Sequence, residues 1–261
     1  MQLIRFTASL VLCALATCSA AFPVNGSAHE VDDSQTLLDR RGTAVPFGAV
    51  IDRCTVPGTL ALTFDDGPFI FTNRILDLLR ANGARATFFL TGQLHSNIVS
   101  SGDIVRRAVA EGHQVGSHTW SHPWLVGGLD PTVMVRQMTQ LESAFSQIIG
   151  RIPTYMRPPY LAVDGAVLAI MGQLGYHVIS ASIDTKDYEN DDPVAIWNSF
   201  EKFRRELDGG GTITLAHDVH RSTVEILAQA MIDEGKKRGL KLVTVGECLG
   251  DAPENWYRGA R

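Results

Sequence analysis

The sequence predicts a single α/β domain built as a barrel of alternating strands and helices. Seven short apolar runs typical of strands alternate with six amphipathic runs typical of helices, and glycine follows most of the helix-like runs. Strict alternation of this kind implies parallel strands joined by crossover helices. Because no Rossmann glycine pattern is present, a (β/α) barrel is favoured over an open doubly wound sheet.

The elements are predicted in chain order from these runs. The expected strands are 59–64, 86–90, 113–117, 154–157, 177–183, 211–216 and 241–243. The expected helices are 72–82, 103–111, 131–149, 164–174, 194–207 and 222–238. Helix ends are indicated by Asn82-Gly83, Gly150 and Arg238-Gly239, because glycine readily adopts the left-handed conformation that closes many helices.

Length and charge narrow the class of protein. With 261 residues and 45% hydrophobic content, the chain can bury one substantial core. The formal net charge of −5 provides no basic surface for nucleic acid or for an anionic membrane. A neutral or cationic partner is therefore favoured over a polyanion, and we expect a monomer.

The N-terminus has the features of a secretory signal peptide, which we place at residues 1–21. Arg5 supplies the positive charge, 6–16 the apolar segment, and 19–21 small residues for cleavage. A membrane anchor is the alternative, but this apolar segment is shorter than the roughly 20 residues that span a bilayer.

The polar segment 22–41 ends in Arg40-Arg41, which predicts a removed pro-segment, although a dibasic pair is often merely solvated. The mature catalytic domain would then be 42–261. We expect a secreted, extracellular protein, with association with a cell wall as an open possibility.

Two cysteines remain outside the predicted signal peptide. Cys54 precedes the first strand and Cys248 lies near the end of the chain. In an exported protein they suggest one disulfide, whereas two free buried thiols are the alternative. Neither cysteine has the close spacing of a zinc site.

The chemistry is expected to centre on Asp65 and Asp66, which end the first strand in the stretch Thr63-Phe-Asp-Asp-Gly-Pro68. Adjacent side chains on an extended chain point in opposite directions. One carboxylate could then face a metal ion while its neighbour faces a water or a substrate. Taken alone, such a pair is more often part of a turn or a helix cap.

His118 and His122 follow the third strand at a spacing of four residues, which allows both to bind one ion. An isolated pair of this kind is more often one core histidine and one exposed histidine. Adding Asp66 gives two histidines and a carboxylate, a common set for Zn²⁺ with an open position for water. Cobalt, manganese or iron would suit the same ligands.

Other strand ends carry groups for proton transfer. His217 could act as an acid, and either Asp184 or Asp187 could favour its protonated form. Arg157 could orient Asp65 through a bidentate pair, or it could bond to loop carbonyls. Asp65 and Asp184 could also form a glycosidase pair, but that interpretation leaves the two histidines unused.

These stretches together carry a family resemblance. Thr-Phe-Asp-Asp-Gly-Pro, His-Thr-Trp-Ser-His, Arg-Pro-Pro-Tyr, Asp-Thr-Lys-Asp-Tyr and Leu-Ala-His-Asp, in this order, resemble the five motifs of the polysaccharide deacetylases, carbohydrate esterase family four. The resemblance covers about residues 54–248. More narrowly, the chain is similar to secreted fungal chitin deacetylases. The resemblance implies a distorted (β/α)₇ barrel and metal-dependent removal of acetyl groups from N-acetylglucosamine units of chitin or its oligomers.

The resemblance also implies roles for individual residues. Asp65 would be the general base, His217 the general acid, and Arg157 and Asp187 would orient or tune them. The metal ligands would be Asp66, His118 and His122. The backbone N–H of Tyr160 would help to hold the oxyanion, and Leu215 would line the acetyl pocket.

One residue departs from the family pattern. The family has Trp directly after the second aspartate of the fourth motif, whereas this chain has Tyr188. A phenol is smaller and can donate a hydrogen bond, so the wall of the acetyl pocket is expected to differ. Removal of O-acetyl esters from xylan, or chitin binding without catalysis, are the alternative functions.

Overall fold

The structure is a computed structural model that describes residues 45–259, which belong to one compact unit. The predicted signal peptide and pro-segment, 1–41, lie outside the described residues. No helix in the described part of the chain is long and apolar enough to cross a membrane.

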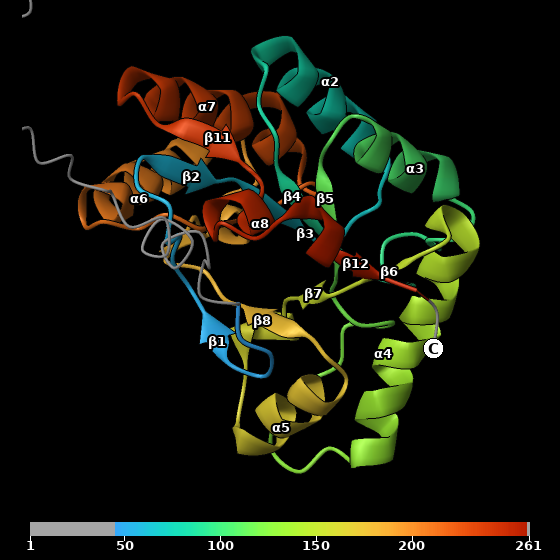
Figure 1. Cartoon of the computed structure of the whole chain (residues 1–261). Helices are drawn as coiled ribbons and strands as arrows, with labels where there is room; N and C mark the ends of the chain where they lie inside the picture. The colour runs from blue at the N-terminus through green and yellow to red at the C-terminus, as the bar shows by residue number, and fades with distance from the viewer. Residues whose placement is uncertain (1–44, 260–261) are drawn as a thin grey trace, which may run out of the picture. The chain divides into compact units, whose positions relative to one another are not determined.

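The core of the fold is one sheet of eight parallel strands in the order β1-β8-β7-β5-β4-β3-β10-β9 (Figure 1). Their bounds are β1 (Val50–Ile51), β3 (Thr63–Asp65), β4 (Thr87–Leu90), β5 (Gln114–Ser117), β7 (Tyr155–Met156), β8 (His177–Ile179), β9 (Ile183–Asp184) and β10 (Thr214–His217). Because every pair is parallel, all carboxyl ends lie at the same rim of the sheet.

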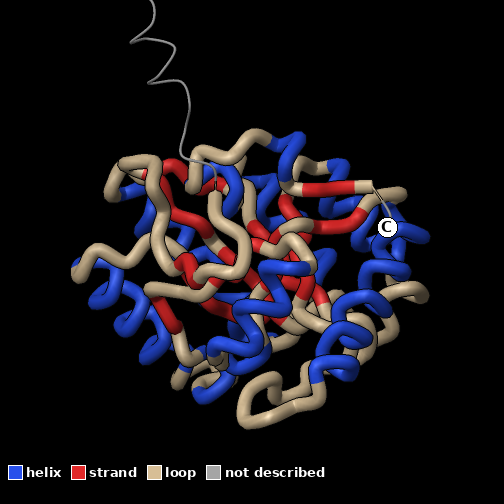
Figure 2. Tube along the Cα trace, turned by 60° about the horizontal axis from the view of Figure 1, so that its bottom comes forward, coloured by secondary structure: helices blue, strands red, loops and turns tan. Residues whose placement is uncertain are grey.

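Helices surround this sheet, so that strands occupy the middle of the fold and helices its outside (Figure 2). They are α2 (Thr72–Asn82), α3 (Gly102–Ala110), α4 (Pro131–Ile149), α5 (Gly165–Gln173), α6 (Ile196–Asp208) and α7 (Ala228–Lys237), the last preceded by a π-helical turn, Thr223–Leu227. The predictions for 72–82 and 131–149 match α2 and α4 in full. Leu79, Phe88, Phe145 and Phe203 are among the fully buried side chains between helices and sheet.

The sheet curls into a half-barrel, and one predicted strand is divided between two distant positions in it. The run 177–183 was expected to be a single strand, but it forms the whole of β8, which lies next to the edge strand β1, and the first residue of β9, which is the opposite edge strand. Ser180 donates a backbone hydrogen bond to Ile51 at one edge, and Ser182 donates one to Ile213 near the other. The chain itself therefore connects β8 to β9, and no continuous ladder of hydrogen bonds joins these two strands directly among the described residues.

Four smaller strands and one short helix extend the fold beyond the sheet. β2 (Thr59–Ala61) pairs in parallel with β11 (Lys241–Val243), and β6 (Ile152–Pro153) pairs antiparallel with β12 (Tyr257–Arg258). Helix α8 (Val245–Cys248) carries one end of a disulfide between Cys248 and Cys54, as predicted. β1, α8 and β12 were not expected from the sequence, because segments this short have no measurable periodicity.

Candidate metal centre and active site

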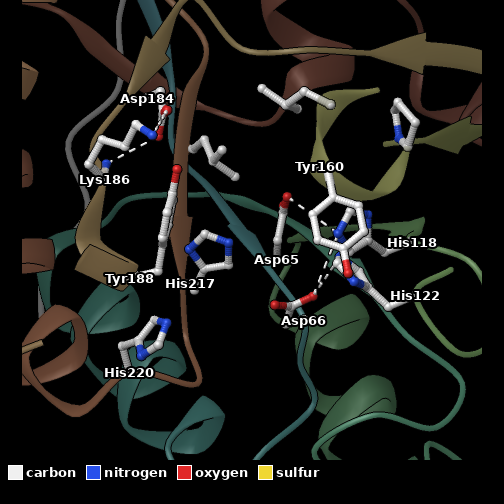
Figure 3. A pocket seen from close by; sticks show the side chains of 13 residues that line it. Asp65, Asp66, His118, His122, Tyr160, Asp184, Lys186, Tyr188, His217 and His220 are labelled. Atoms are coloured by element: carbon white, nitrogen blue, oxygen red, sulfur yellow. Dashed lines mark hydrogen bonds and ion pairs between the residues drawn. The ribbon is translucent and has the colours of Figure 1, made fainter. Parts of the chain in front are cut away.

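Most of the predicted site residues line a pocket of 430 Å³ at the carboxyl ends of the strands (Figure 3), while Arg157 and Asp187 contact lining residues without lining it themselves. Side chains from β3, β10 and the loops after β5, β7 and β9 contribute to it. The lining residues are Asp65, Asp66, His118, His122, Pro158, Tyr160, Leu161, Asp184, Lys186, Tyr188, Leu215, His217 and His220.

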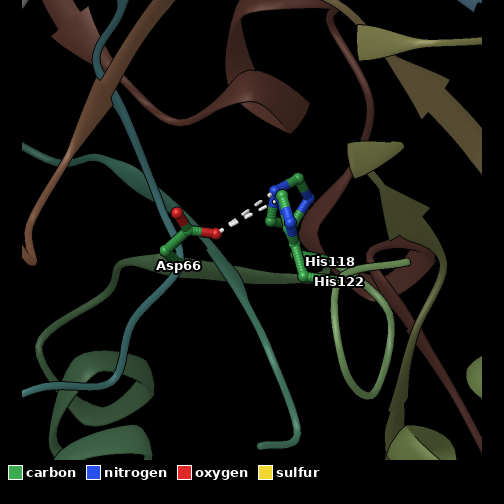
Figure 4. A group of neighbouring side chains, drawn as sticks. All are labelled: Asp66, His118 and His122. Atoms are coloured by element: carbon green, nitrogen blue, oxygen red, sulfur yellow. Dashed lines mark ion pairs between the residues drawn. The ribbon is translucent and has the colours of Figure 1, made fainter. Parts of the chain in front are cut away.

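Asp66, His118 and His122 converge in a geometry that can hold a metal ion (Figure 4). Their potential ligand atoms all lie within 4.8 Å of one another. The Oδ1 atom of Asp66 is 3.6 Å from Nε2 of His118 and 3.6 Å from Nε2 of His122. That Oδ1 is buried and has no hydrogen-bond partner within residues 45–259, so a bound cation would satisfy it.

The protonation of the two histidines also fits a metal ion. Nδ1 of His118 lies 2.7 Å from the backbone carbonyl oxygen of Arg157, so this nitrogen donates a hydrogen bond and Nε2 keeps its lone pair. Burial lowers the pKa of His118 to about 3 and that of His122 to about 4. Both imidazoles are therefore neutral at physiological pH, as metal ligands must be.

A tight loop, and not a helix, brings the two histidines together. Thr119 and His122 have φ angles of 70° and 56°, in the left-handed region that few non-glycine residues adopt. The Thr119 hydroxyl accepts a hydrogen bond of 3.1 Å from the backbone N–H of His122, which closes the loop. Strained backbone of this kind is frequent at functional sites.

The expectation that Asp65 and Asp66 point in opposite directions was wrong. It assumed an extended chain, but Asp66 has a φ of 72°. The left-handed turn rotates its carboxylate back into the pocket beside that of Asp65, whose Oδ2 is 3.8 Å from Nε2 of His118. Both carboxylates therefore face the same space (Figure 3).

Asp65 accepts a hydrogen bond from one nitrogen of the Arg157 guanidinium group. Nη1 of this fully buried arginine donates to Oδ1 of Asp65 at 2.9 Å. The predicted bidentate pair is not formed, because Nη2 donates to the carbonyl of Ser180 and Nε to that of Ile179. Burial raises the pKa of Asp65, and the Arg157 guanidinium offsets part of that rise.

Across the pocket, His217 is paired with Asp187. Nδ1 of His217 lies 2.8 Å from Oδ1 of Asp187, and the backbone N–H of His217 donates to Oδ2 of the same carboxylate at 2.6 Å. Burial lowers the pKa of His217, but the Asp187 carboxylate more than compensates and brings it to about 9. Asp184, the other partner considered, instead accepts from the backbone N–H of Lys186 at 3.1 Å.

Aromatic side chains form the rim of the pocket. Tyr160 has 59% of its surface exposed, and its ring lies 4.6 Å from that of His122 and 5.0 Å from that of the exposed Trp124. On the other side, Tyr188 is 44% exposed and packs edge-on against His217 at 5.5 Å. Leu215 provides a buried apolar wall.

Sequence reasoning did not identify Lys186, His220 or Trp124 as part of this region. Lys186 lies inside the fourth motif and Trp124 two residues after the second, so their position in the chain was the available signal. His220 follows His217 by three residues, and its Nδ1 is 3.2 Å from Oδ2 of Asp191. It thus forms a second histidine–carboxylate pair at the pocket.

Comparison with known proteins finds consistent similarities. Residues 52–179 match the family described as polysaccharide deacetylase. The chain is 53% identical over 221 residues to a chitin deacetylase of Pestalotiopsis sp, covering 85% of this chain and 74% of that protein. The solved structure of the chitin deacetylase from Colletotrichum lindemuthianum is 50% identical and superposes with a TM-score of 0.80, covering 83% of this chain and 98% of that one.

A bacterial relative is more distant. The solved Bc1960 peptidoglycan N-acetylglucosamine deacetylase is 28% identical, with a TM-score of 0.68, covering 79% of this chain and 94% of that one.

Proposed function

The chain belongs to the polysaccharide deacetylase family, and we propose that it is a zinc-dependent chitin deacetylase that hydrolyses N-acetyl groups of chitin or chitin oligomers. One observation carries the proposal: the Asp66–His118–His122 set, the arginine-held Asp65 and the carboxylate-held His217 all face one pocket. Relatives of 53% and 50% identity are named chitin deacetylases, which supports chitin as the substrate.

Asp66, His118 and His122 would hold the ion. When bound, Zn²⁺ supplies Lewis acidity, which lowers the pKa of a water and polarises the acetyl carbonyl. Two histidines and one carboxylate would leave positions on the ion for water and substrate.

Asp65 acts as the general base in this proposal. It takes a proton from the water that attacks the acetyl carbon, and its hydrogen bond to Arg157 keeps one oxygen fixed while the other stays directed to the reacting atoms. The backbone N–H of Tyr160 donates to the oxygen that becomes negative. Leu215 and Tyr188 flank the acetyl methyl group.

His217 acts as the general acid. Asp187 keeps it protonated, so it can give a proton to the amide nitrogen as the carbon–nitrogen bond breaks. The products are acetate and a glucosamine unit with a free amine. The water supplies the new oxygen of acetate. One of its protons goes to Asp65 and can restore His217 for the next cycle, and the other remains on the new carboxyl group until that group ionises.

We also propose that the protein is exported. The Cys54–Cys248 disulfide supports this, because such bonds persist mainly in oxidising compartments. The signal peptide at 1–21 and the pro-segment at 22–41 stay predictions. Secreted material whose N-terminus is Gly42 would support both, whereas a start at Phe22 would contradict removal of the pro-segment.

The experiment that tests the function measures acetate release from chitin oligomers and from acetylated xylan, before and after chelation and zinc re-addition. Chelator-sensitive release from chitin oligomers is the expected result. Release from xylan alone would make the protein an esterase. No release from either substrate, with zinc bound, would point to chitin binding without catalysis.

A further inference from the structure

Asp218 is a buried acid that the proposed reaction does not use. It follows His217 at the end of β10, and its side chain is fully buried. Burial raises the pKa of its carboxyl to about 7, and its Oδ1 has no hydrogen-bond partner among the described residues. Burying a carboxyl with an unsatisfied oxygen lowers the stability of a fold, so a compensating role is expected for Asp218.

The second oxygen of Asp218 reaches the turn that carries the metal ligand. Oδ2 accepts a hydrogen bond from the hydroxyl of Thr72, the first residue of α2. The same hydroxyl oxygen accepts a 2.8 Å hydrogen bond from the backbone N–H of Phe69. Through one hydroxyl, the carboxylate is therefore connected to the turn 66–71 between β3 and α2.

The carboxylate also packs directly against Gly67, the neighbour of Asp66. A Cβ atom at Gly67 would lie 2.7 Å from Oδ1 and 2.8 Å from Oδ2 of Asp218, closer than real Cβ contacts. On its other side, the Gly67 carbonyl accepts a 2.9 Å hydrogen bond from the backbone N–H of Thr91. The turn is thus clamped between Asp218 and Thr91.

We propose that Asp218 is a positioning residue that clamps the 66–71 turn, and so holds Asp66 in the metal site at a set distance from His217. Asp218 and His217 are consecutive, so one strand end supplies both the acid and the support for the ligand. The role given to His217 rests on the proposed function. The expected effect of Asp218 on the metal site does not.

The test measures the affinity for Zn²⁺ alone, by competition with a chromogenic chelator, in Asp218→Ala, Asp218→Asn and Thr72→Val. Loss of support for a ligand typically lowers metal affinity by roughly 10- to 100-fold, which is the result expected for Asp218→Ala. Asp218→Asn keeps the size and an acceptor for Thr72, so it should restore most of the affinity. Thr72→Val, which removes the bridging hydroxyl, should also weaken binding.

Asp130→Ala is the matched control. Asp130 caps the start of α4 by accepting from the N–H of Thr132 at 2.7 Å, and its loss should lower the melting temperature without changing zinc affinity. Unchanged affinity in Asp218→Ala, or an equal loss in Asp130→Ala, would overturn the proposal. If Asp218→Ala does not fold, unchanged affinity in Thr72→Val overturns it. If the parent chain binds zinc but releases no acetate, the proposed function is refuted. The zinc affinities of the variants still test the role of Asp218.

Discussion

The backbone angle of Asp66 shapes the chemistry of the whole site. Its φ of 72° turns a carboxylate that an extended chain would direct away into the space shared by Asp65, His118 and His122. The two neighbouring acids then differ in their partners and not in the direction they face. Asp65 bonds to an arginine, while the Oδ1 of Asp66 lies 3.6 Å from Nε2 of each of the two histidines.

This difference predicts separate effects for the two aspartates. Asp65→Asn should lower the rate of deacetylation by about 10²- to 10⁴-fold, because an amide cannot accept the proton. Its zinc content, measured by elemental analysis, should stay near that of the parent. Asp66→Asn is the comparison, and it should lose zinc as well as activity. Loss of zinc in Asp65→Asn would show that the roles of base and ligand are assigned the wrong way round.

The pKa of His217 predicts how activity and stability depend on pH. Its pKa is raised from an ordinary value of about 6.5 to about 9, with burial opposing the shift and Asp187 driving it. The His217–Asp187 pair therefore stabilises the fold fully below pH 6.5, and this contribution disappears as the pH rises through 9.

In Asp187→Asn, the charge that favours the imidazolium is gone. The alkaline limb of the profile of kcat/KM against pH should then move to lower pH. Asp191→Asn, beside His220, is the control that should leave that limb in place. An unshifted limb in Asp187→Asn would mean that His217 is not the acid observed in the profile.

Among the elements of the fold, the disulfide links the segment before β2 to helix α8. Cys54 precedes β2 and Cys248 ends α8, at a sequence separation of 194. The Cys54→Ser/Cys248→Ser variant should lose about 5 kcal/mol in the free energy of unfolding, the chain-entropy value for so long a loop. Denaturant unfolding measures this loss. Neither cysteine lines the pocket, so kcat at low temperature should be unchanged. A variant as stable as the parent would contradict a stabilising role.

The loop after β5 predicts how longer substrates bind. Trp124 lies beyond the pocket, 55% exposed, with its ring 5.0 Å from that of Tyr160. An exposed indole at this place offers an apolar face to a sugar next to the reacting unit. Trp124→Ala should raise KM for long chitin oligomers more than for the dimer, with kcat little changed.

Trp197 on α6, 49% exposed and outside the pocket lining, is the matched control for Trp124. Trp197→Ala should leave KM unchanged at every oligomer length. An equal rise in KM for the dimer and for long oligomers in Trp124→Ala would instead indicate a disturbed pocket.

Metal binding should affect the molecule as a whole. The three ligands come from the segments after β3 and β5, so a bound ion joins parts of the fold that are about 50 residues apart in the chain. With free Zn²⁺ at 100 times its Kd, the free energy of unfolding should rise by about 2.7 kcal/mol. Thermal unfolding with and without chelator measures this, and the Asp66→Asn variant should show no such difference.

The sequence by itself determined the alternation of the main strands and helices, the extent of α2 and α4, and the acids, histidines and arginine that meet at the site. These features are carried by local periodicity, by glycine stops and by motifs in a fixed order, all of which are readable along the chain. In a parallel α/β fold the strand ends share one rim, so residues that follow strands can be expected to meet.

Only the tertiary structure decided how those residues are oriented and paired. The run 177–183 is divided between β8 and β9, and Asp66 is turned toward Asp65. His217 pairs with Asp187 and not with Asp184. Arg157 donates from one nitrogen to Asp65 and from the others to carbonyl oxygens. Each outcome depends on a backbone angle or on a partner from a distant segment. The physical reason is that burial removes water as an alternative partner, so the available neighbours, and not the local sequence, decide which hydrogen bonds form.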